Sequence, residues 1–506
     1  MTETRLPPIV RGELQPWTDA NPAGGPALTA LLADLLPVRI GRTLVAGPHD
    51  AGVLDLVARR SADLTVLVRS VSDAAALRDR GAVVNGALDG LAAENPARYD
   101  VIIAADGLDR LLGPDSPALD WTQRADLLRG LATPGALVVI AVENEFSITG
   151  LLDRRPANER HGDGEWRPLH DDPRRPTSPA QIEAVFGPVT HRYARFAAHT
   201  LLDSGALRRT RPGFPGARLA LAGLAAEASG TPLLAPVTGA AEAAARAGML
   251  DAVAPGWIVA VGGAGETRTA YAGSLTADLG ADGWRVGDRV VLDVENAETV
   301  LFRLAAAEDV PGFRAYAARL AEAGSIAFFD EIHDFTPAPF GAPTAGATAE
   351  ERLAAAWIRF GDRLIGGHRR HPWPPWMADG DDLVTTWLAM SGVEATPELR
   401  ARGRVIAGEP AEHTDPLSLL ADADAAQRKI DEQAGHIAGL ERTLRFRDQQ
   451  LRTREQQLRA LRDELRRLRS GRAVRAASFV GRVARLRDPK RLAGAVKRRA
   501  KAFLLR

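Results

Sequence analysis

The sequence predicts an α/β chain with a parallel, doubly wound sheet, a second α+β domain and a C-terminal coiled-coil helix. Three observations predict it. Nearly continuous Val, Ile and Ala runs alternate with helical segments between residues 39 and 200, which is typical of a parallel sheet covered on both faces. Shorter strand-like runs followed by helices occupy residues 256–410. Apolar residues then recur every seven positions over residues 423–470.

The first region alternates strands and helices in a regular order. We expect Ser72 to cap the helix that begins at residue 71, and Pro134 with Gly135 to end the helix that begins at Trp121. Strands are predicted at residues 43–46, 63–69, 82–84, 98–106 and 136–144, and helices at residues 51–60, 71–81 and 121–135.

The other boundaries follow from changes in composition along a chain that is too long for one hydrophobic core. The expected divisions are an N-terminal segment (1–38), the sheet domain (39–200), an Ala/Gly/Pro-rich connection (201–255), the α+β domain of unknown role (256–410), a linker (411–422), the coiled coil (423–470) and a basic amphipathic tail (471–506).

The heptad pattern predicts self-association. The d series is interrupted by Gln433, Arg447 and Arg454. A single solvated helix would leave the apolar seam in water, so a homo-oligomer is expected, with strand number and direction left open. The a positions are Ile430, Ile437, Leu444, Leu451, Leu458 and Leu465, and the apolar d positions are Leu440, Leu461 and Leu468.

The tail carries most of the chain's charge asymmetry. Residues 472–506 hold twelve Lys or Arg and one Asp, a net charge of +11 that the remainder balances, since the whole chain is neutral. Phe479, Val483 and Leu486 recur at helical spacing among the basic residues. A basic amphipathic helix suits an anionic membrane surface. Nucleic acid is the less favoured partner, because the tail has no aromatic stacking platform and the acidic remainder repels phosphate.

Several classes of protein are disfavoured. The chain contains no Cys, so neither disulfides nor a thiolate metal site is possible. The first residues do not read as a secretory signal, and no apolar run is long enough to span a bilayer. We expect a cytoplasmic protein, peripheral on the inner face of the membrane.

Three stretches carry a family resemblance. They are the strand and turn TLVAGPHDAG (43–52), the strand RYDVIIAADGLDRL (98–111) and the helix and strand LLRGLATPGALVVIAVEN (127–144). In this order and spacing they resemble class I S-adenosylmethionine-dependent methyltransferases. The loop that follows resembles that of methyltransferases among bacterial cell-surface polysaccharide enzymes, and the whole chain resembles a multidomain actinobacterial member. The resemblance implies a Rossmann-like methyltransferase domain.

The resemblance also implies where S-adenosylmethionine would bind. In the family, a glycine-rich turn admits the cofactor, an acid after the second strand grips its ribose, and an acid after the third strand meets its adenine. Here the turn contains His49, the second strand ends at Arg69, and Ala87 stands where the third-strand acid is expected. The motif is therefore degenerate. The cofactor-binding candidates are Gly47, Asp50, Gly52, Asp89, Asp106, Glu143 and Asn144.

Transfer of a methyl group to a sugar hydroxyl gains from a base that removes the hydroxyl proton. The polar loop 158–172 supplies His161 and His170 as catalytic candidates. A solvated polar loop is the alternative. No helical His spacing supports a metal site. For HRRHPWPPWM (368–377), stacking on a sugar and packing as an ordinary loop both remain open.

The expected function is O-methylation of a sugar or cell-surface glycan precursor, with S-adenosylmethionine as cofactor and a glycan as acceptor. The first alternative is a catalytically inactive methyltransferase-like scaffold that organises glycan-biosynthesis enzymes. The second is a nicotinamide-dependent oxidoreductase, against which the absence of GxGxxG after the first strand argues.

Overall fold

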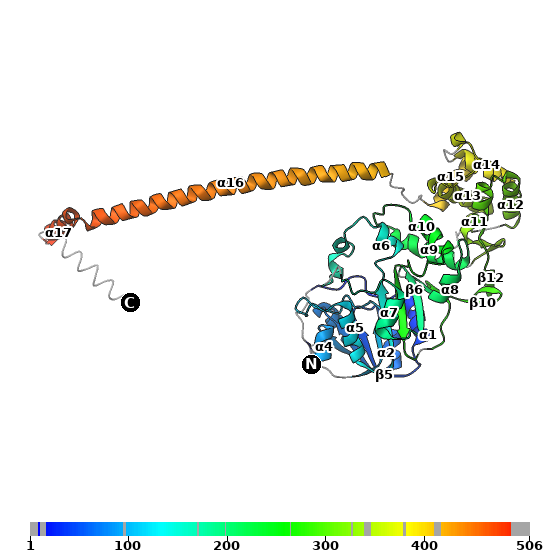
Figure 1. Ribbon diagram of the computed structural model, residues 1–506, viewed down its shortest axis with the longest axis horizontal. Helices are drawn as coiled ribbons and strands as arrows, with labels where there is room; N and C mark the ends of the chain where they lie inside the picture. The colour runs from blue at the N-terminus through cyan, green and yellow to red at the C-terminus, as the bar shows by residue number, and fades with distance from the viewer. Residues whose placement is uncertain are drawn as a thin grey trace. The chain divides into compact units, whose positions relative to one another are not determined.

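The computed structural model describes residues 9–10, 17–94, 98–168, 172–197, 199–263, 265–324, 327–338, 346–377, 381–408 and 416–486. The chain divides into two units, Met1–Thr414 and Asp415–Arg506. Each unit is described by itself. Figure 1 traces the elements in chain order from blue to red.

The first unit is built on a sheet whose first five strands are all parallel. Their spatial order is β3-β2-β1-β4-β5, so the predicted parallel, Rossmann-like sheet is confirmed. The order reverses between β1 and β4, where open α/β sheets bind ligands outside the carboxyl ends of the strands. The five strands are β1 (Ile40–Ala46), β2 (Ser61–Val68), β3 (Ala82–Asn85), β4 (Tyr99–Ala104) and β5 (Ala132–Glu143).

The sheet continues beyond the boundary expected at residue 256. Strand β8 lies antiparallel between β5 and β6, so residues 256–261 belong to the central sheet and not to a second domain. The pairing of β5 with β8 joins residues more than a hundred positions apart, and a local sequence pattern does not identify so distant a partner. The remaining strands are β6 (His191–Phe196), β7 (Thr200–Asp203), β8 (Gly256–Val261), β9 (Ala270–Ala272), β10 (Leu275–Gly280), β11 (Gly283–Val286) and β12 (Arg289–Val291).

Helices cover both faces of the sheet, because successive strand residues point to opposite sides. Ile102 and Ile140 belong to one buried core with α4 to α10, whereas Val101 and Val139 belong to the other with α1 to α3. The helices are α1 (Pro26–Leu35), α2 (Ala51–Arg60), α3 (Val71–Leu77), α4 (Leu88–Glu94), α5 (Trp121–Gly130), α6 (Ile148–Leu152), α7 (Pro179–Phe186), α8 (Ser204–Arg209), α9 (Pro215–Ala228) and α10 (Val237–Arg246).

Side-chain caps fix where these helices begin. The carboxylate of Asp120 forms a capping box at α5. The cap of α3 is Ser70, whose hydroxyl accepts from the Asp73 amide, and not the expected Ser72, which lies inside the helix. Helix α5 ends at Gly130, five residues before the expected end, because β5 already begins at Ala132.

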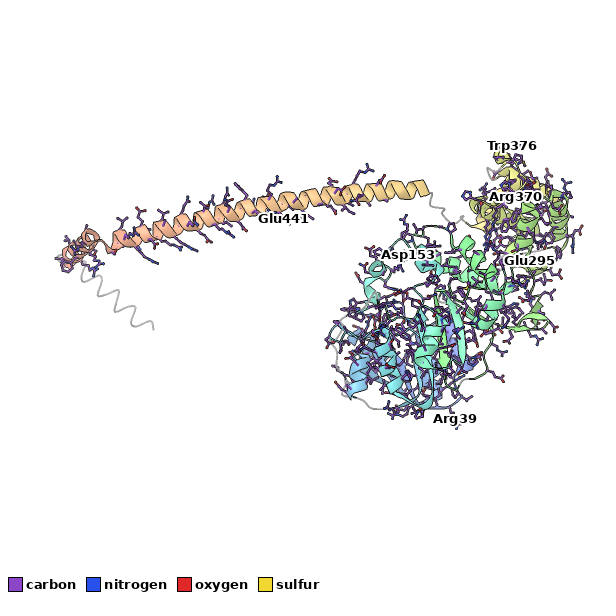
Figure 2. The ribbon with its side chains drawn as sticks, in the orientation of Figure 1. Arg39, Asp153, Glu295, Arg370, Trp376 and Glu441 are labelled. Carbon is purple, nitrogen blue, oxygen red and sulfur yellow. The ribbon has the colours of Figure 1, made fainter. Side chains whose placement is uncertain are left out.

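Among the described residues of 297–407, the regular elements are helices, apart from the two-residue strands β13 and β14. The expected α+β domain is therefore mainly α here. Its own core surrounds Phe313, Trp357 and Trp387. Trp373 packs edge-on against Phe313, whereas Trp376 is exposed (Figure 2). The elements are α11 (Ala297–Ala306), α12 (Val310–Glu322), β13 (Ile332–His333), β14 (Thr336–Pro337), α13 (Ala349–Gly366), α14 (Asp381–Met390) and α15 (Pro397–Ala407).

The second unit consists of α16 (Pro416–Ser470) and α17 (Arg472–Leu486). Side chains project along α16, Glu441 among them (Figure 2). No helix among the described residues is long and apolar enough to cross a membrane. The part of the expected tail after Leu486 lies outside the described residues.

Candidate functional site

The first strand ends in a turn that only glycine fits. Gly47 has φ of 91°, and its amide donates to the carbonyl of Leu67 on β2 at 2.9 Å. A Cβ at Gly47 would stand 3.2 Å from the side chain of Leu111. The turn therefore keeps the backbone form expected of a ligand loop. We call the space between the carboxyl ends of β1 and β4 the crevice.

The imidazole of His49 bridges this crevice. Its Nδ1 lies 3.0 Å from the carbonyl oxygen of Gly47, and its Nε2 accepts from the amide of Ala105, just after β4, at 3.2 Å. Only 6% of the residue is exposed, and burial lowers the pKa of His49. A neutral ring with its proton on Nδ1 satisfies both contacts. The side chain thus lies at the carboxyl ends of β1 and β4, where a ligand of an open α/β sheet would bind.

A segment from the N-terminal side lies along the turn. We call Trp17–Gly25 the closing segment. The amide of Asp50 donates to the Ala23 carbonyl at 2.9 Å, and the Ala23 amide donates to Pro48 at 3.0 Å. Asp50 caps α2 with one carboxylate oxygen and accepts from the Gly25 amide with the other at 2.7 Å. Asp50 and Gly52 are therefore at the expected turn, but the carboxylate of Asp50 is already paired.

A buried ion pair holds the closing segment at the end of β2. The guanidinium of Arg69 binds both carboxylate oxygens of Asp19, at 2.9 and 2.7 Å. Both side chains are only 2% exposed. Arg69 also donates to the carbonyl of Trp166 at 2.6 Å. Arg69 and its partner Asp19 thus lie at the end of β2. At this position the methyltransferases that the sequence resembles have an acidic residue that binds the ribose.

A second ion pair holds the closing segment at the end of β4. Asp106 pairs with Arg110 four residues later, with the Nε of Arg110 2.8 Å from the Oδ2 of Asp106. The same guanidinium donates to the backbone carbonyls of Ala20 and Asn21. Asp106 lies at the crevice as expected, but both of its oxygens serve this clamp. Sequence reasoning missed Arg69, Arg110 and Asp19 because their partners are set by the tertiary fold.

The other candidates after the third and fifth strands also have internal partners. Asp89, which lies in α4, accepts a hydrogen bond from the hydroxyl of Ser116 at 2.8 Å. Asn144 donates to the carbonyls of Ala252 and Ala254 at 2.9 and 2.8 Å. Asn144 thereby fixes the loop that enters β8. It also lines the cavity beside β5, but its side-chain amide already donates to two backbone carbonyls.

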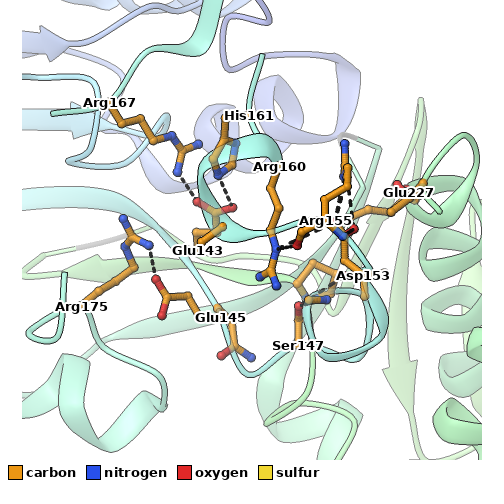
Figure 3. A pocket seen from close by; sticks show the side chains of 16 residues that line it. Glu143, Glu145, Ser147, Asp153, Arg155, Arg160, His161, Arg167, Arg175 and Glu227 are labelled. Atoms are coloured by element: carbon orange, nitrogen blue, oxygen red, sulfur yellow. Dashed lines mark hydrogen bonds and ion pairs between the residues drawn. The ribbon is translucent and has the colours of Figure 1, made fainter. Parts of the chain in front are cut away.

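Glu143 ends β5 within a charged cluster (Figure 3). Burial by itself would raise the pKa of Glu143, but the guanidinium of Arg167, with His161 and Arg175, outweighs it and lowers that pKa to about 2. Arg167 donates directly to Glu143, and the Nε2 of His161 lies 3.5 Å from the same carboxylate. Glu143 is therefore anionic throughout the physiological range.

His161 is the catalytic candidate that reaches the site. Its Nδ1 lies 3.3 Å from Glu165, and Glu165 accepts from the side-chain amide of Asn21 at 2.5 Å. The hydrogen bond from His161 lowers the pKa of Glu165 to about 2. The imidazole thus stands between two carboxylates and connects Glu143 to the closing segment. His170, the other candidate, lies outside the described residues.

Two cavities adjoin this cluster. One of about 290 Å³ extends from Glu143 past Ser147 and Arg155 to Glu227. A smaller one of about 210 Å³ lies between the closing segment and the carboxyl end of β4. Glu143, His161 and Arg167 line both. Open space therefore lies beside β5 and at the carboxyl end of β4, whereas the imidazole of His49 occupies the position between β1 and β4.

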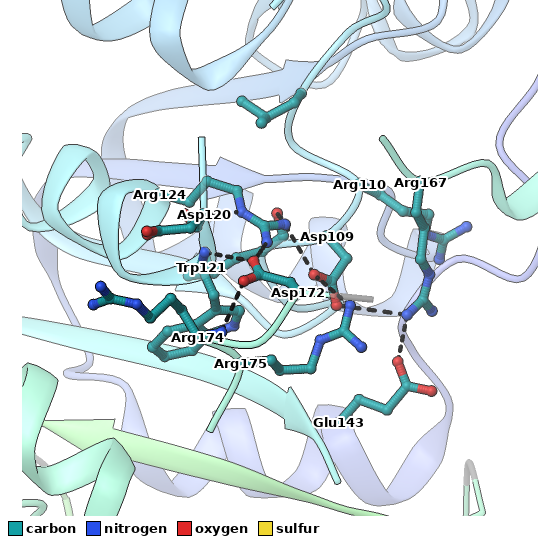
Figure 4. Close-up of polar contacts among 12 residues, drawn as sticks. Asp109, Arg110, Asp120, Trp121, Arg124, Glu143, Arg167, Asp172, Arg174 and Arg175 are labelled. Carbon is teal, nitrogen blue, oxygen red and sulfur yellow. Dashed lines mark hydrogen bonds and ion pairs between the residues drawn. The ribbon is translucent and has the colours of Figure 1, made fainter. Parts of the chain in front are cut away.

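Buried arginine–carboxylate contacts make this edge of the sheet rigid (Figure 4). Arg124, which is fully buried, pairs with Asp109 at 2.9 Å and with Asp172 at 2.6 Å. Arg175 lies 3.3 Å from Asp109 and also pairs with Glu145. Such pairs hold their loops in place because a lone buried charge is costly. Within the described ranges, no three His, Asp or Glu side chains are grouped as a metal site would need.

Comparisons with known proteins give partial likenesses. No family model and no curated protein matches the chain. The solved structures that match include N- and O-methyltransferases, each matched over part of its length. The N-methyltransferase NodS of Bradyrhizobium japonicum, solved with S-adenosylhomocysteine, is 16% identical over 24% of this chain and 59% of its own, with a TM-score of 0.19.

Two further structures give similar values. The methyltransferase CcbJ of Streptomyces caelestis is 23% identical over 26% of this chain and 53% of its own, with a TM-score of 0.20. A phosphoethanolamine N-methyltransferase of Haemonchus contortus, also solved with S-adenosylhomocysteine, is 11% identical over 49% of this chain and 52% of its own, with a TM-score of 0.25. This chain thus spans a little over half of each of these proteins.

Proposed function

We propose that the sheet domain is a methyltransferase-like domain whose crevice is closed by the chain itself. The chain then serves as a non-catalytic scaffold that gathers glycan-directed enzymes at a membrane surface. The closed crevice carries this proposal. His49 bridges β1 and β4, and the closing segment is held by Arg69 and Arg110.

The residues at the crevice do not fit S-adenosylmethionine in this arrangement. The cofactor would bring a positively charged sulfonium and two ribose hydroxyls, which need acceptors. The acceptors at hand are used internally, Asp106 by Arg110 and Asp50 by the Gly25 amide. The end of β2 offers the cation Arg69, already bound to Asp19. Binding would therefore require the closing segment to leave.

Opening the crevice is expensive. The closing segment would give up its hydrogen bonds to Asp50, Arg69 and Arg110. Hydrogen bonds to charged groups contribute about 1.5–3 kcal/mol each, and each 1.4 kcal/mol weakens binding about tenfold. An intrinsic affinity of about 1 μM would thus weaken to about 0.1 mM or beyond. Cellular binding of the cofactor would be marginal even if the opened crevice could hold it.

Thermal unfolding tests this proposal. A ligand that binds only the folded chain raises its melting temperature, by an amount equivalent to about 2.7 kcal/mol at a hundredfold excess over Kd. With about 20 μM S-adenosylmethionine or S-adenosylhomocysteine, well below the weakened Kd of about 0.1 mM, we expect no shift. A rise of several degrees with either compound would refute the closed crevice.

A second candidate function is O-methylation of a sugar or glycan-precursor hydroxyl with S-adenosylmethionine as the donor. The cavity beside β5 favours it, because His161 lines that cavity within reach of Glu143 and suits a base for a hydroxyl. Transfer of labelled methyl from the donor to a panel of nucleotide-linked sugars would support it, provided that His161→Gln abolishes the transfer. Absence of transfer with all acceptors leaves the scaffold.

The scaffold part of the proposal depends on the helical unit. Helix α17 exposes Phe479 and Val480 among Arg472, Arg475 and Arg482. Basic side chains near an anionic leaflet each contribute about 1 kcal/mol. We propose that this helix, with the residues that follow it, places the chain on the inner face of the membrane, and that nucleic acid is not its partner.

A further inference from the structure

Helix α16 carries an apolar stripe that has no partner among the described residues. The stripe consists of the a and d apolar side chains, from Ile430 to Leu468. All nine are between 52% and 63% exposed. Two such stripes bury each other when helices supercoil. The other faces of α16 carry charged side chains such as Arg445 and Glu441, which pair within the helix.

We infer that α16 pairs with the α16 of a second copy of this chain, parallel and in register. Charge complementarity selects this arrangement. In a parallel pair, each g position faces the e position of the next heptad in the other helix. Glu464 then faces Arg469, and His436 faces Glu441. The other such pairs combine an uncharged residue with a charged one, so no like charges meet between g and e positions.

The polar d positions fit the same register. Arg447 is followed by Asp448 and Arg454 by Glu455. In a parallel pair each d side chain faces the same d residue of the other helix and packs beside its e residue. Arg447 and Arg454 therefore each face the identical arginine, and Asp448 and Glu455 of the second copy place a carboxylate beside each of them. The antiparallel pair that overlaps fully, with Ile437 facing Leu461, instead sets Glu441 against Glu455, which are like charges.

This arrangement has a consequence for the basic segment. Helix α17 begins at Arg472, directly after α16 ends at Ser470. A parallel pair places both copies of α17 at one end of the rod, where they double the basic charge that meets a single surface. The inference concerns the helical unit alone, so it stands or falls independently of the closed crevice.

Single cysteines test the pairing directly, since the chain contains none. Full-length Ile437→Cys and Leu461→Cys are oxidised separately and then as a mixture. In the parallel pair each variant alone forms a disulfide dimer, because identical positions face each other. Gln449→Cys, at an outward f position, is the matched control and should stay largely unlinked. The native mass in solution should be twice the 54.0 kDa of one chain.

Other outcomes overturn the inference. Linkage only in the mixture of Ile437→Cys and Leu461→Cys chains means an antiparallel pair. A native mass of one chain, or of more than two, means that no parallel dimer forms. The charge argument has its own test, since Glu464→Arg should weaken association about fivefold. Adding Arg469→Glu should restore it, and failure of that restoration would remove charge complementarity as the cause.

Discussion

At the scale of single residues, the site depends on internal partners for groups that the sequence offers as ligand contacts. Asp106 and Asp50 are at the crevice, as their places after β1 and β4 predict. Their carboxylates are nevertheless used by Arg110 and by the Gly25 amide. A sequence pattern locates a side chain on an element, but it does not identify the partner that the fold supplies, such as the Gly25 amide for Asp50.

His49 should make stability depend on pH. Burial lowers its pKa, so between that value and the ordinary 6.5 the folded chain binds fewer protons than the unfolded chain. Stability then rises with pH through this window and falls as the solution is acidified. His49→Gln should lose that part of the dependence, measured as the difference in melting temperature between pH 7.5 and pH 5.5.

The control for this prediction is His199→Gln, because His199 is exposed between β6 and β7. It should leave the pH dependence as in the native chain. An unchanged dependence in His49→Gln would mean that the imidazole is not held neutral between β1 and β4.

The Arg69–Asp19 pair should be strongly coupled. Arg69→Ala or Asp19→Ala leaves an uncompensated buried charge and should each cost about 3–5 kcal/mol of unfolding free energy. The double variant should cost clearly less than the sum. Urea denaturation followed by tryptophan fluorescence measures the three values. The exposed pair Arg370–Glu308 is the matched control and should change stability by under about 1 kcal/mol. Additive losses at Arg69 and Asp19 would contradict the buried pair.

At the scale of elements, the sequence pattern predicted a helix or strand correctly where neighbouring residues determine it. Helix α2 spans Ala51–Arg60 as predicted, because Asp50 caps it and its apolar positions have helical spacing. Strand β8 could not be assigned in this way. Its apolar run resembles a strand of any sheet, and only its pairing with β5 places residues 256–261 in the central sheet.

The cap of α3 provides a matched pair of substitutions. Ser70→Ala removes the hydroxyl that accepts from the Asp73 amide and should cost about 1 kcal/mol. Ser72→Ala, two residues later inside the helix, should stay within about 0.5 kcal/mol. Hydrogen exchange of the α3 amides measures both. A larger loss for Ser72→Ala would restore Ser72 as the cap.

At the scale of the whole molecule, the chain combines a closed α/β domain with an exposed helical unit. The heptad spacing predicted the α16 helix because apolar a positions recur over six heptads. The closure of the crevice could not be predicted in the same way, since it depends on where the closing segment lies relative to β1, β2 and β4.

The basic helix should direct the chain to anionic lipid. Full-length protein should cosediment with vesicles containing anionic phospholipid but not with purely zwitterionic vesicles, and added salt should release it. Replacing Arg472, Arg475 and Arg482 by Glu should abolish binding. Equal binding to both vesicle types would contradict a membrane role for the charge, and preferential binding to nucleic acid would replace it.

The closed crevice is tested most directly by isothermal titration calorimetry of the full-length chain with S-adenosylmethionine and, separately, S-adenosylhomocysteine. The arrangement of His49, Arg69 and Arg110 predicts no heat of binding up to about 0.1 mM ligand. Saturable binding of either compound with a micromolar Kd would contradict it, because the crevice would then open at little cost.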